Sequence, residues 1–143
     1  MKRIFAAMAV AMGLSITSVT QAGPFTSMTV FGDSLSDTGN VFALSGNTVP
    51  PPPYFNGRFS NGPNWIDVMA AQLGLTTNVA PYALGGNNYA FGGARTGAGT
   101  NPVPGLLAQE GGLWGPTHAT ADATGLYVLA GGGNDMRDAR SAF

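Results

Sequence analysis

Apolar residues in this chain gather in a few short runs that polar, glycine-rich and proline-rich stretches separate. The run from Met28 to Phe31 ends at Gly32 and predicts a strand. The run from Gly125 to Ala130 is unbroken and is followed by three glycines, which favours a strand covered on both faces, as in a parallel sheet between helices. A shorter extended segment is expected over residues 87–91.

One helix has clear start and stop signals. Pro63 can occupy the first helical position after a cap at Asn61 or Gly62, and Gly74 ends the pattern. The apolar residues at helical spacing, predicted to face the core, are Trp65, Val68, Met69 and Leu73.

Other helical signals are weaker. A short helix is expected over residues 103–109, and another from Met136 onward with Asn134 or Asp135 as its cap. Residues 41–62 contain a run of four prolines and are predicted to form a loop.

The first 22 residues have the pattern of a secretory signal peptide. Lys2 and Arg3 precede an apolar stretch from Ile4 to Leu14, and small residues follow up to Ala22. We expect cleavage there and an exported protein, whether secreted, periplasmic or at the cell surface; an uncleaved membrane anchor is the alternative. Residues 23–143 would then form the folded domain.

Charge and cysteine content exclude some functions. The full chain has six basic and seven acidic residues, so removal of Lys2 and Arg3 leaves a net charge of about −3. No cluster of basic residues suits a nucleic-acid backbone, and no nucleic-acid partner is expected. The chain has no cysteine, and its fold therefore does not depend on disulfides.

Candidate chemistry begins at Ser34, two residues after the first predicted strand. A sharp turn there would present the hydroxyl at the mouth of the sheet, and a helix starting just after it would direct free N–H groups at a developing negative oxygen. An ordinary strand-to-helix turn is the competing interpretation. Asp33 and Asp37 are better interpreted as turn and cap residues than as catalytic acids.

Two later segments follow the same pattern of short apolar run, glycine and small polar residue. They end in Gly92-Gly93 and in Asn134. Because the carboxyl ends of strands gather at one edge of an open α/β sheet, a hydroxyl, a backbone N–H and a carboxamide could meet there. Acyl transfer requires such a set of a nucleophile and preorganised donors.

These three segments resemble the sequence blocks of the GDSL, or SGNH, family of serine esterases and lipases. The blocks are Gly32-Asp33-Ser34-Leu35-Ser36-Asp37-Thr38-Gly39-Asn40, Gly86-Asn87-Asn88-Tyr89-Ala90-Phe91-Gly92-Gly93-Ala94 and Gly132-Gly133-Asn134-Asp135. The resemblance implies a flavodoxin-like three-layer α/β/α sandwich with a mostly parallel sheet, incomplete in this chain. It also implies an ester hydrolase that needs no cofactor and no metal.

The same resemblance implies roles for individual residues. Ser34 would be the nucleophile, and its own N–H, the N–H of Gly93 and the side chain of Asn134 would form the oxyanion hole. Gly92 is the alternative to Gly93. Substrates would be small-molecule or lipid esters, with contact to a lipid or membrane surface as one option, and the oligomeric state stays open.

Surface residues near these blocks have two interpretations each. Arg58 and Arg95 could meet a polar headgroup or a product carboxylate, although a solvated surface role is favoured. The aromatic residues Tyr54, Phe55 and Phe59 either line an acyl or aryl pocket or pack within their own loop.

The sequence departs from the family pattern in one respect. It contains no Asp-x-x-His motif, and its single histidine, His118, precedes the third block in a loop-like stretch. We therefore expect that this chain is a fragment and is inactive alone, because a serine without its base is a poor nucleophile. A non-catalytic secreted module that retains the pocket is the alternative function; an adhesive or structural segment would leave the three blocks unexplained.

Overall fold

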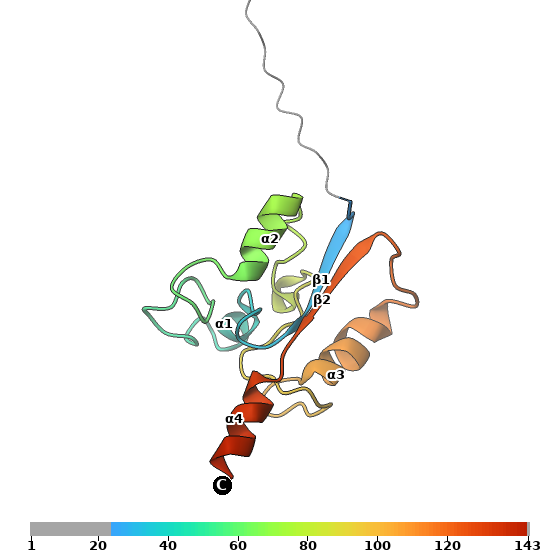
Figure 1. Cartoon of the computed structure of the whole chain (residues 1–143). Coiled ribbons are helices and arrows are strands. Elements are labelled where there is room, and N and C mark those ends of the chain that lie inside the picture. The colour runs from blue at the N-terminus through green and yellow to red at the C-terminus, as the bar shows by residue number, and fades with distance from the viewer. Residues whose placement is uncertain (1–23, 143) are drawn as a thin grey trace, which may run out of the picture.

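The computed structural model describes residues 24–142, so the predicted signal peptide lies outside the described residues. Two strands, β1 (Ser27–Gly32) and β2 (Gly125–Ala130), pair in parallel. Ser27 lies opposite Gly125, and Gly32 lies opposite Ala130 (Figure 1). Both predicted strands and their parallel arrangement are confirmed.

The predicted extended segment over residues 87–91 lies along the other edge of β1. The Val30 N–H donates to the Asn87 carbonyl at 3.0 Å, and the Val30 carbonyl accepts from the Tyr89 N–H at 2.7 Å. The Phe91 N–H then donates to the Gly32 carbonyl at 3.1 Å. β1 is therefore the central element, with a parallel neighbour on each side.

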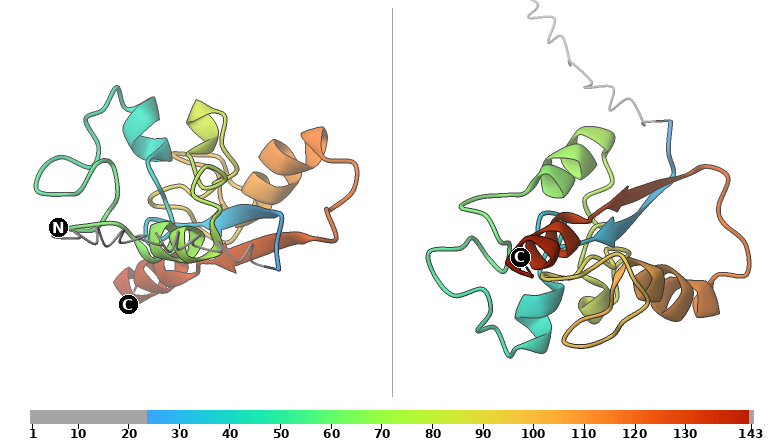
Figure 2. Two further views of the ribbon diagram at one scale, coloured as in Figure 1. Left: turned by 90° about the horizontal axis from the view of Figure 1, so that it is seen from above. Right: turned by 60° about the horizontal axis from the view of Figure 1, so that its bottom comes forward.

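Helices lie on both faces of this sheet (Figure 2). The helix α2 (Trp65–Leu73) packs on the face that carries Met28 and Val30. The short helix α1 (Asn40–Leu44) and the π-helix η2 (Gln109–Trp114) lie on the opposite face, where Phe31 contacts the Trp114 ring edge-on. The expected α/β/α layering is confirmed, with an incomplete sheet.

The remaining helical elements are short. They are the 3₁₀-helices η1 (Tyr82–Leu84) and η3 (Gly115–Thr117), the one-turn α3 (Leu106–Ala108), and the C-terminal α4 (Gly133–Ser141). No helix within residues 24–142 has both the length and the apolar character that crossing a bilayer requires.

The structure corrects the predicted cap and core face of α2. Its N-cap is Asn64, whose side chain accepts from the Ile66 and Asp67 N–H groups, and not Asn61 or Gly62. Ile66 and Ala70 are buried, Met69 and Leu73 flank them, and Trp65 and Val68 are exposed. Positions 66, 69, 70 and 73 form an equally regular helical stripe, and this stripe packs on the core. Gly74 ends the helix with φ 72°, as predicted.

One loop prediction and two helix predictions were wrong in their bounds. Residues 41–62 are not all loop, because α1 begins at Asn40. The helical region expected over 103–109 starts later, at Leu106, and continues as η2. Gly132, at φ 104°, is the N-cap of α4, so Asn134 and Asp135 lie within its first turn.

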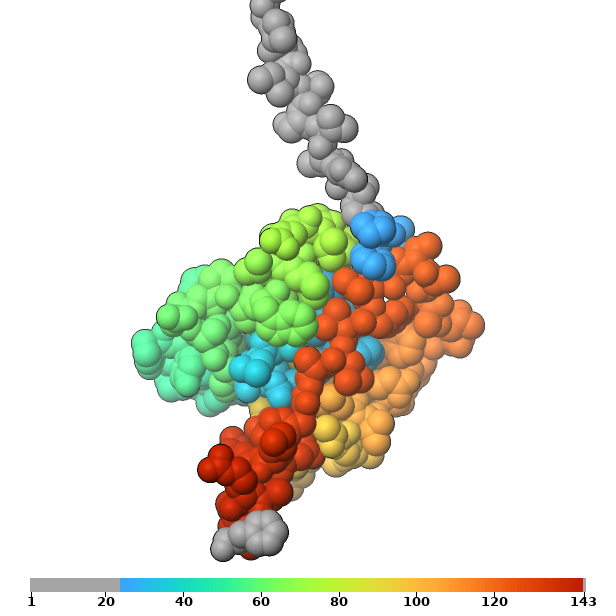
Figure 3. Space-filling view, viewed as in Figure 1, coloured from blue at the N-terminus to red at the C-terminus, as the bar shows by residue number. Residues whose placement is uncertain are grey.

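β2 is covered on one face only, contrary to the expectation from its unbroken apolar sequence. Leu126 and Val128 pack on the core beside α2, whereas Leu129 is 68% exposed and Tyr127 is 39% exposed. Figure 3 shows β2 running along the surface next to α2. The Tyr127 ring packs edge-on against Trp114 with ring centroids 5.8 Å apart, and the Tyr127 hydroxyl accepts from the Asp122 N–H at 2.7 Å.

Buried amide side chains complete the outer edge of the 87–91 segment. Asn40 is fully buried and donates to the carbonyls of Asn88 and Ala90 at 2.7 and 2.8 Å. Its side-chain oxygen accepts from the Ala83 N–H at 2.9 Å. Asn88 accepts from the Ala90 N–H through its own side-chain oxygen. These carboxamides satisfy this edge together with the backbone of residues 80–82, where the Asn88 N–H donates to the Ala80 carbonyl at 3.1 Å and the Asn88 carbonyl accepts from the Tyr82 N–H at 2.8 Å.

We predict that Asn40→Ala lowers the free energy of unfolding by about 3 kcal/mol, because the Ala90 carbonyl and the Ala83 N–H lose their partner and the Asn88 carbonyl keeps only its bond from the Tyr82 N–H. Asn61→Ala, the same change at an exposed position, is the matched control and should alter stability by no more than about 0.5 kcal/mol. Urea denaturation of both variants measures the difference. Equal stabilities would contradict the proposed role of Asn40.

Candidate active site

Ser34 lies in a tight turn directly after β1. The Asp33 carbonyl accepts from the N–H groups of Ser36 and Asp37, both at 3.0 Å, and the Asp33 carboxylate accepts from the Leu35 N–H at 3.0 Å. Asp33 is therefore a turn residue, as predicted. No helix begins just after Ser34, since α1 starts only at Asn40. Ser34 itself is half-buried.

Asp37 fixes the end of this turn. Its buried carboxylate accepts from the N–H groups of Gly39 at 2.7 Å, Asn40 at 2.6 Å and Val41 at 3.3 Å. It also accepts from the Gly92 N–H at 2.9 Å. The same side chain thus holds the start of α1, as its predicted cap role requires, and the glycine pair of the second block.

The glycine pair follows the 87–91 segment with tight steric limits. Gly93 has φ 88°, in the region that favours glycine. A Cβ at Gly92 would overlap the Phe59 ring, so this aromatic side chain covers the backbone there. Gly93 carries the N–H predicted for the oxyanion hole, and it lies two residues beyond Phe91, whose N–H bonds to the end of β1.

Asn134 is buried in the first turn of α4, and its side chain donates to the Ala94 carbonyl at 2.8 Å. The third block is therefore tied to the residue that follows Gly93. A carboxamide carries two N–H hydrogens, so this bond leaves a second donor.

The three predicted site residues follow the same end of the sheet. Ser34 comes two residues after Gly32, and Asn134 comes four residues after Ala130, which is the partner of Gly32 in the parallel ladder. Gly93 follows the segment on the other side of β1. This is the sheet edge where ligands bind in open α/β folds.

The sequence analysis did not identify Gln109, whose side chain binds the backbone of Gly32 just before the serine turn. Gln109 is fully buried at the start of η2. Its side-chain oxygen accepts from the Gly32 N–H at 2.8 Å, and its amide donates to the Gly32 carbonyl at 2.8 Å and to the Pro104 carbonyl at 2.9 Å. The carboxamide thus pairs with Gly32 as a neighbouring strand would. No motif surrounds this glutamine that could have indicated its role.

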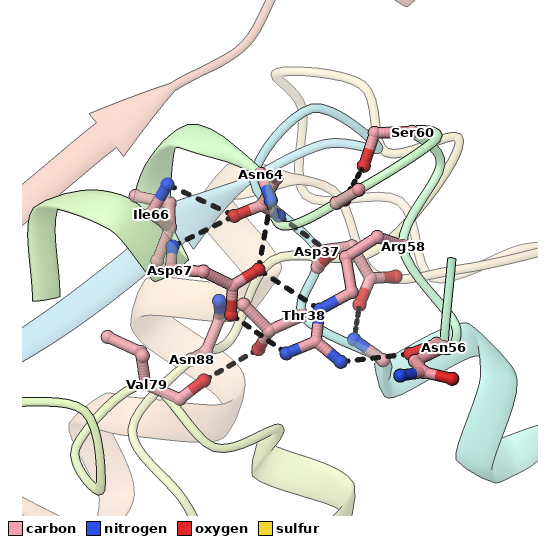
Figure 4. A network of polar contacts seen from close by, with 12 residues as sticks. Asp37, Thr38, Asn56, Arg58, Ser60, Asn64, Ile66, Asp67, Val79 and Asn88 are labelled. Atoms are coloured by element: carbon pink, nitrogen blue, oxygen red, sulfur yellow. Dashed lines mark hydrogen bonds and ion pairs between the residues drawn. The ribbon is translucent and has the colours of Figure 1, made fainter. Parts of the chain in front are cut away.

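A second polar network lies beside the serine turn (Figure 4). Arg58 pairs with Asp67 through Nε at 3.1 Å and Nη2 at 2.8 Å, and its third nitrogen donates to the Asn56 carbonyl. Asn64, the cap of α2, donates to the Asp37 carbonyl at 3.0 Å. Arg58 is thus occupied by a bidentate ion pair and anchors a loop, rather than offering its charge to a headgroup.

The other candidates from the sequence have local contacts. Arg95 forms an ion pair with Asp138. Tyr54 and Phe55 are exposed. Phe59 packs near the Tyr54 ring and covers the backbone of Gly92. His118 is exposed, and its ring stacks on Trp114 with a centroid distance of 4.8 Å. Its Nδ1 contacts the Thr117 hydroxyl and the Trp114 carbonyl. Among the described residues no cluster of His, Cys, Asp or Glu could hold a metal ion.

These features define an α/β protein in which a strand–serine turn, a glycine pair and a helix-borne asparagine share one sheet edge. Residues 28–142 match the family model described as GDSL-like Lipase/Acylhydrolase, and the chain belongs to this family. The resemblance of the three sequence blocks is thereby confirmed.

Curated relatives agree with this assignment. The chain is 38% identical over 88 residues to a phosphatidylcholine-sterol acyltransferase of Aeromonas hydrophila, which covers 60% of this chain and 26% of that protein. It is 34% identical over 143 residues to Lipase 1 of Photorhabdus luminescens, covering 95% and 20%. A GDSL esterase/lipase of Arabidopsis thaliana is 40% identical over 97 residues, covering 55% and 24%. The chain therefore spans only a fifth to a quarter of these relatives.

We predict that Gln109→Leu destabilises the chain by about 2–4 kcal/mol, because the Gly32 N–H loses its buried partner. Native-state hydrogen exchange should show accelerated exchange of the Gly32 amide. Gln72→Leu, the same change on the exposed side of α2, is the control and should leave that amide protected. Unchanged Gly32 exchange in a folded Gln109→Leu variant would contradict the assigned contact.

A second prediction concerns pH. Burial raises the pKa of Asp37, although four backbone N–H groups act in the opposite direction. The unfolded chain, with a pKa of about 3.9 at this residue, then ionises first, so stability falls as pH rises from about 4 through the folded-state pKa. Asp37→Asn should remove this fall, seen as a difference in urea denaturation at successive pH values.

Asp122 provides a control of opposite sign. Hydrogen bonds from Thr124, Thr26 and Ser27 lower the pKa of this exposed carboxyl. Its contribution is present above the unfolded pKa and is lost as pH falls through the folded-state pKa. Asp122→Asn should therefore reduce the increase in the free energy of unfolding as pH rises. If Asp37→Asn and Asp122→Asn changed the pH dependence of stability in the same direction, the assignment of a raised pKa to buried Asp37 would be contradicted.

Proposed function

We propose that the protein is a serine hydrolase acting on carboxylic ester bonds through an acyl-Ser34 intermediate. The observation that supports this most strongly is that buried hydrogen bonds join the three blocks. The Asp37 carboxylate binds the Gly92 N–H, and the Asn134 side chain binds the Ala94 carbonyl, so the segments on either side of Gly93 are linked to the serine turn and to α4.

In the proposed reaction the Ser34 oxygen attacks the ester carbonyl carbon, and the carbonyl oxygen gains negative charge. The N–H groups of Ser34 and Gly93 and the Asn134 side chain stabilise that oxyanion, each worth on the order of 10²–10³ in rate by analogy with a single oxyanion donor. Collapse expels the alcohol and leaves an acyl ester on Ser34. Water then attacks this ester, which releases the carboxylic acid and restores the hydroxyl.

Deprotonation of Ser34 needs a base that we do not assign within this sequence. The Asp-x-x-His motif is absent from it, and His118 is held by Trp114 and Thr117. Loss of the histidine from a serine triad costs on the order of 10⁶ in turnover. We therefore propose that this chain by itself has no measurable esterase activity and that a longer product supplies the base.

For substrates we propose carboxylic esters, including lipid esters. The names of two relatives, a lipase and a phosphatidylcholine-sterol acyltransferase, support this class. The N-terminal sequence pattern supports export of the protein. A non-catalytic binding module is the second candidate, and the missing histidine motif is the observation that favours it.

The test separates acylation chemistry from the missing base. The purified chain is incubated with a fluorophosphonate probe, with and without added imidazole as an external base, and labelling is located by mass spectrometry. We expect slow labelling of Ser34 that imidazole accelerates, and none in Ser34→Ala. Ser36→Ala is the matched control, because the Ser36 hydroxyl is fully buried two residues away.

Persistent labelling in Ser34→Ala, or failure of imidazole to promote labelling of a chain shown to be folded by NMR, would favour the binding module. Rapid hydrolysis of a short p-nitrophenyl ester by the unmodified chain without imidazole would contradict the proposal that it lacks its base.

A further inference from the structure

An apolar pocket of about 250 Å³ lies between α1 and the loop that precedes α3. Its walls come from three parts of the chain that are distant in sequence. The apolar lining residues are Val41, Leu44, Phe91, Pro102, Val103 and Pro104.

The lining offers a ligand no charge and little hydrogen bonding. Ser45 is its one hydroxyl residue, and that group already donates to the Phe42 carbonyl at 3.0 Å and accepts from the Val49 N–H at 2.9 Å. A group that enters this pocket must therefore be apolar, because any polar atom would lose water without gaining a partner.

The pocket adjoins the proposed oxyanion hole. Phe91, in its wall, lies two residues before Gly93, and a Cβ at Gly93 would lie 4.0 Å from the Val103 side chain. Gln109 also holds the loop of Pro104, since its amide donates to the Pro104 carbonyl and to the Gly32 carbonyl. One side chain thus fixes both the serine strand and a wall of the pocket.

The other side of the same loop has a different character. A smaller hollow of about 190 Å³ lies there, with Arg95, Asn101 and Asp135 among its lining residues. Val103 lines both spaces. The loop over residues 101–105 therefore separates an apolar compartment from a more polar one, which Arg95 and Asp135 line.

We propose that the apolar pocket binds the acyl chain of the ester and that Val103 and Leu44 set the accepted chain length. This inference rests on the proposed function, because Gly93 must hold the carbonyl oxygen for the chain to enter the pocket. Binding should therefore strengthen with chain length until the chain fills the pocket and then level off.

The probe is a series of straight-chain methyl ketones, which carry a carbonyl and an alkyl chain but cannot be hydrolysed. Their dissociation constants are measured on the purified chain by titration of methyl NMR signals. We expect shifts at the methyl groups of Val41, Leu44 and Val103, with about fourfold tighter binding for each added methylene until the pocket is full.

Two variants narrow the pocket, each with a matched control. Val103→Trp fills it, whereas Val68→Trp makes the same change on the exposed side of α2. Leu44→Trp covers its mouth from a position 70% exposed, so it should fold normally, and Leu107→Trp is its control at 63% exposure. The first member of each pair should abolish the gain with chain length, and the second should leave it intact.

Ketone binding that perturbs none of these methyl groups, or equal effects from both members of a pair, would overturn the proposal. The proposed function is tested separately by fluorophosphonate labelling of Ser34, because ketone binding is read from the methyl signals of the pocket and requires no acylation. Ketone binding without labelling of Ser34 would support the pocket and count against the hydrolase. Labelling of Ser34 by alkyl fluorophosphonates at a rate independent of chain length would support the hydrolase and count against the pocket.

Discussion

The site depends on one buried carboxylate. Asp37 has no exposed surface, so its four hydrogen bonds to backbone N–H groups are what make an ionised group tolerable there. Three of these donors begin α1, and the fourth is Gly92 in a different loop. Satisfying one charge therefore fixes the serine turn, the following helix and the glycine pair relative to one another.

Side-chain amides bind backbone groups at the end of β1 and along the 87–91 segment. Gln109 pairs with both backbone groups of Gly32, and Asn40 occupies the outer edge of the 87–91 segment. A carboxamide has the same donor and acceptor as a peptide group, so it can end a ladder without adding backbone. These bonds tie the sheet end near Ser34 to η2 and α1, and the pocket lies between α1 and the 101–105 loop.

The strands, the layering and the three sequence blocks could be predicted, because short apolar runs and the glycine–polar residues after them are local signals. The face of α2 could not, since residues 65 and 66 begin equally good helical stripes, and the hydrogen bond from Asn64 to Asp37 at the start of α2 joins residues far apart in the sequence. The role of Gln109 could not be predicted for a similar reason, because its partner, Gly32, lies 77 residues away in the sequence. The exposed face of β2 could not be predicted, because an apolar run shows which residues favour burial but does not show whether a helix or strand covers them.

The most direct test of the central claim is a crystal structure of the chain with a phosphonyl group on Ser34. The phosphonyl oxygen should accept hydrogen bonds of roughly 2.7–3.1 Å from the N–H groups of Ser34 and Gly93 and from the Asn134 side chain. A phosphonyl oxygen directed to solvent, with Asn134 still bound only to the Ala94 carbonyl, would show that these residues do not form one site.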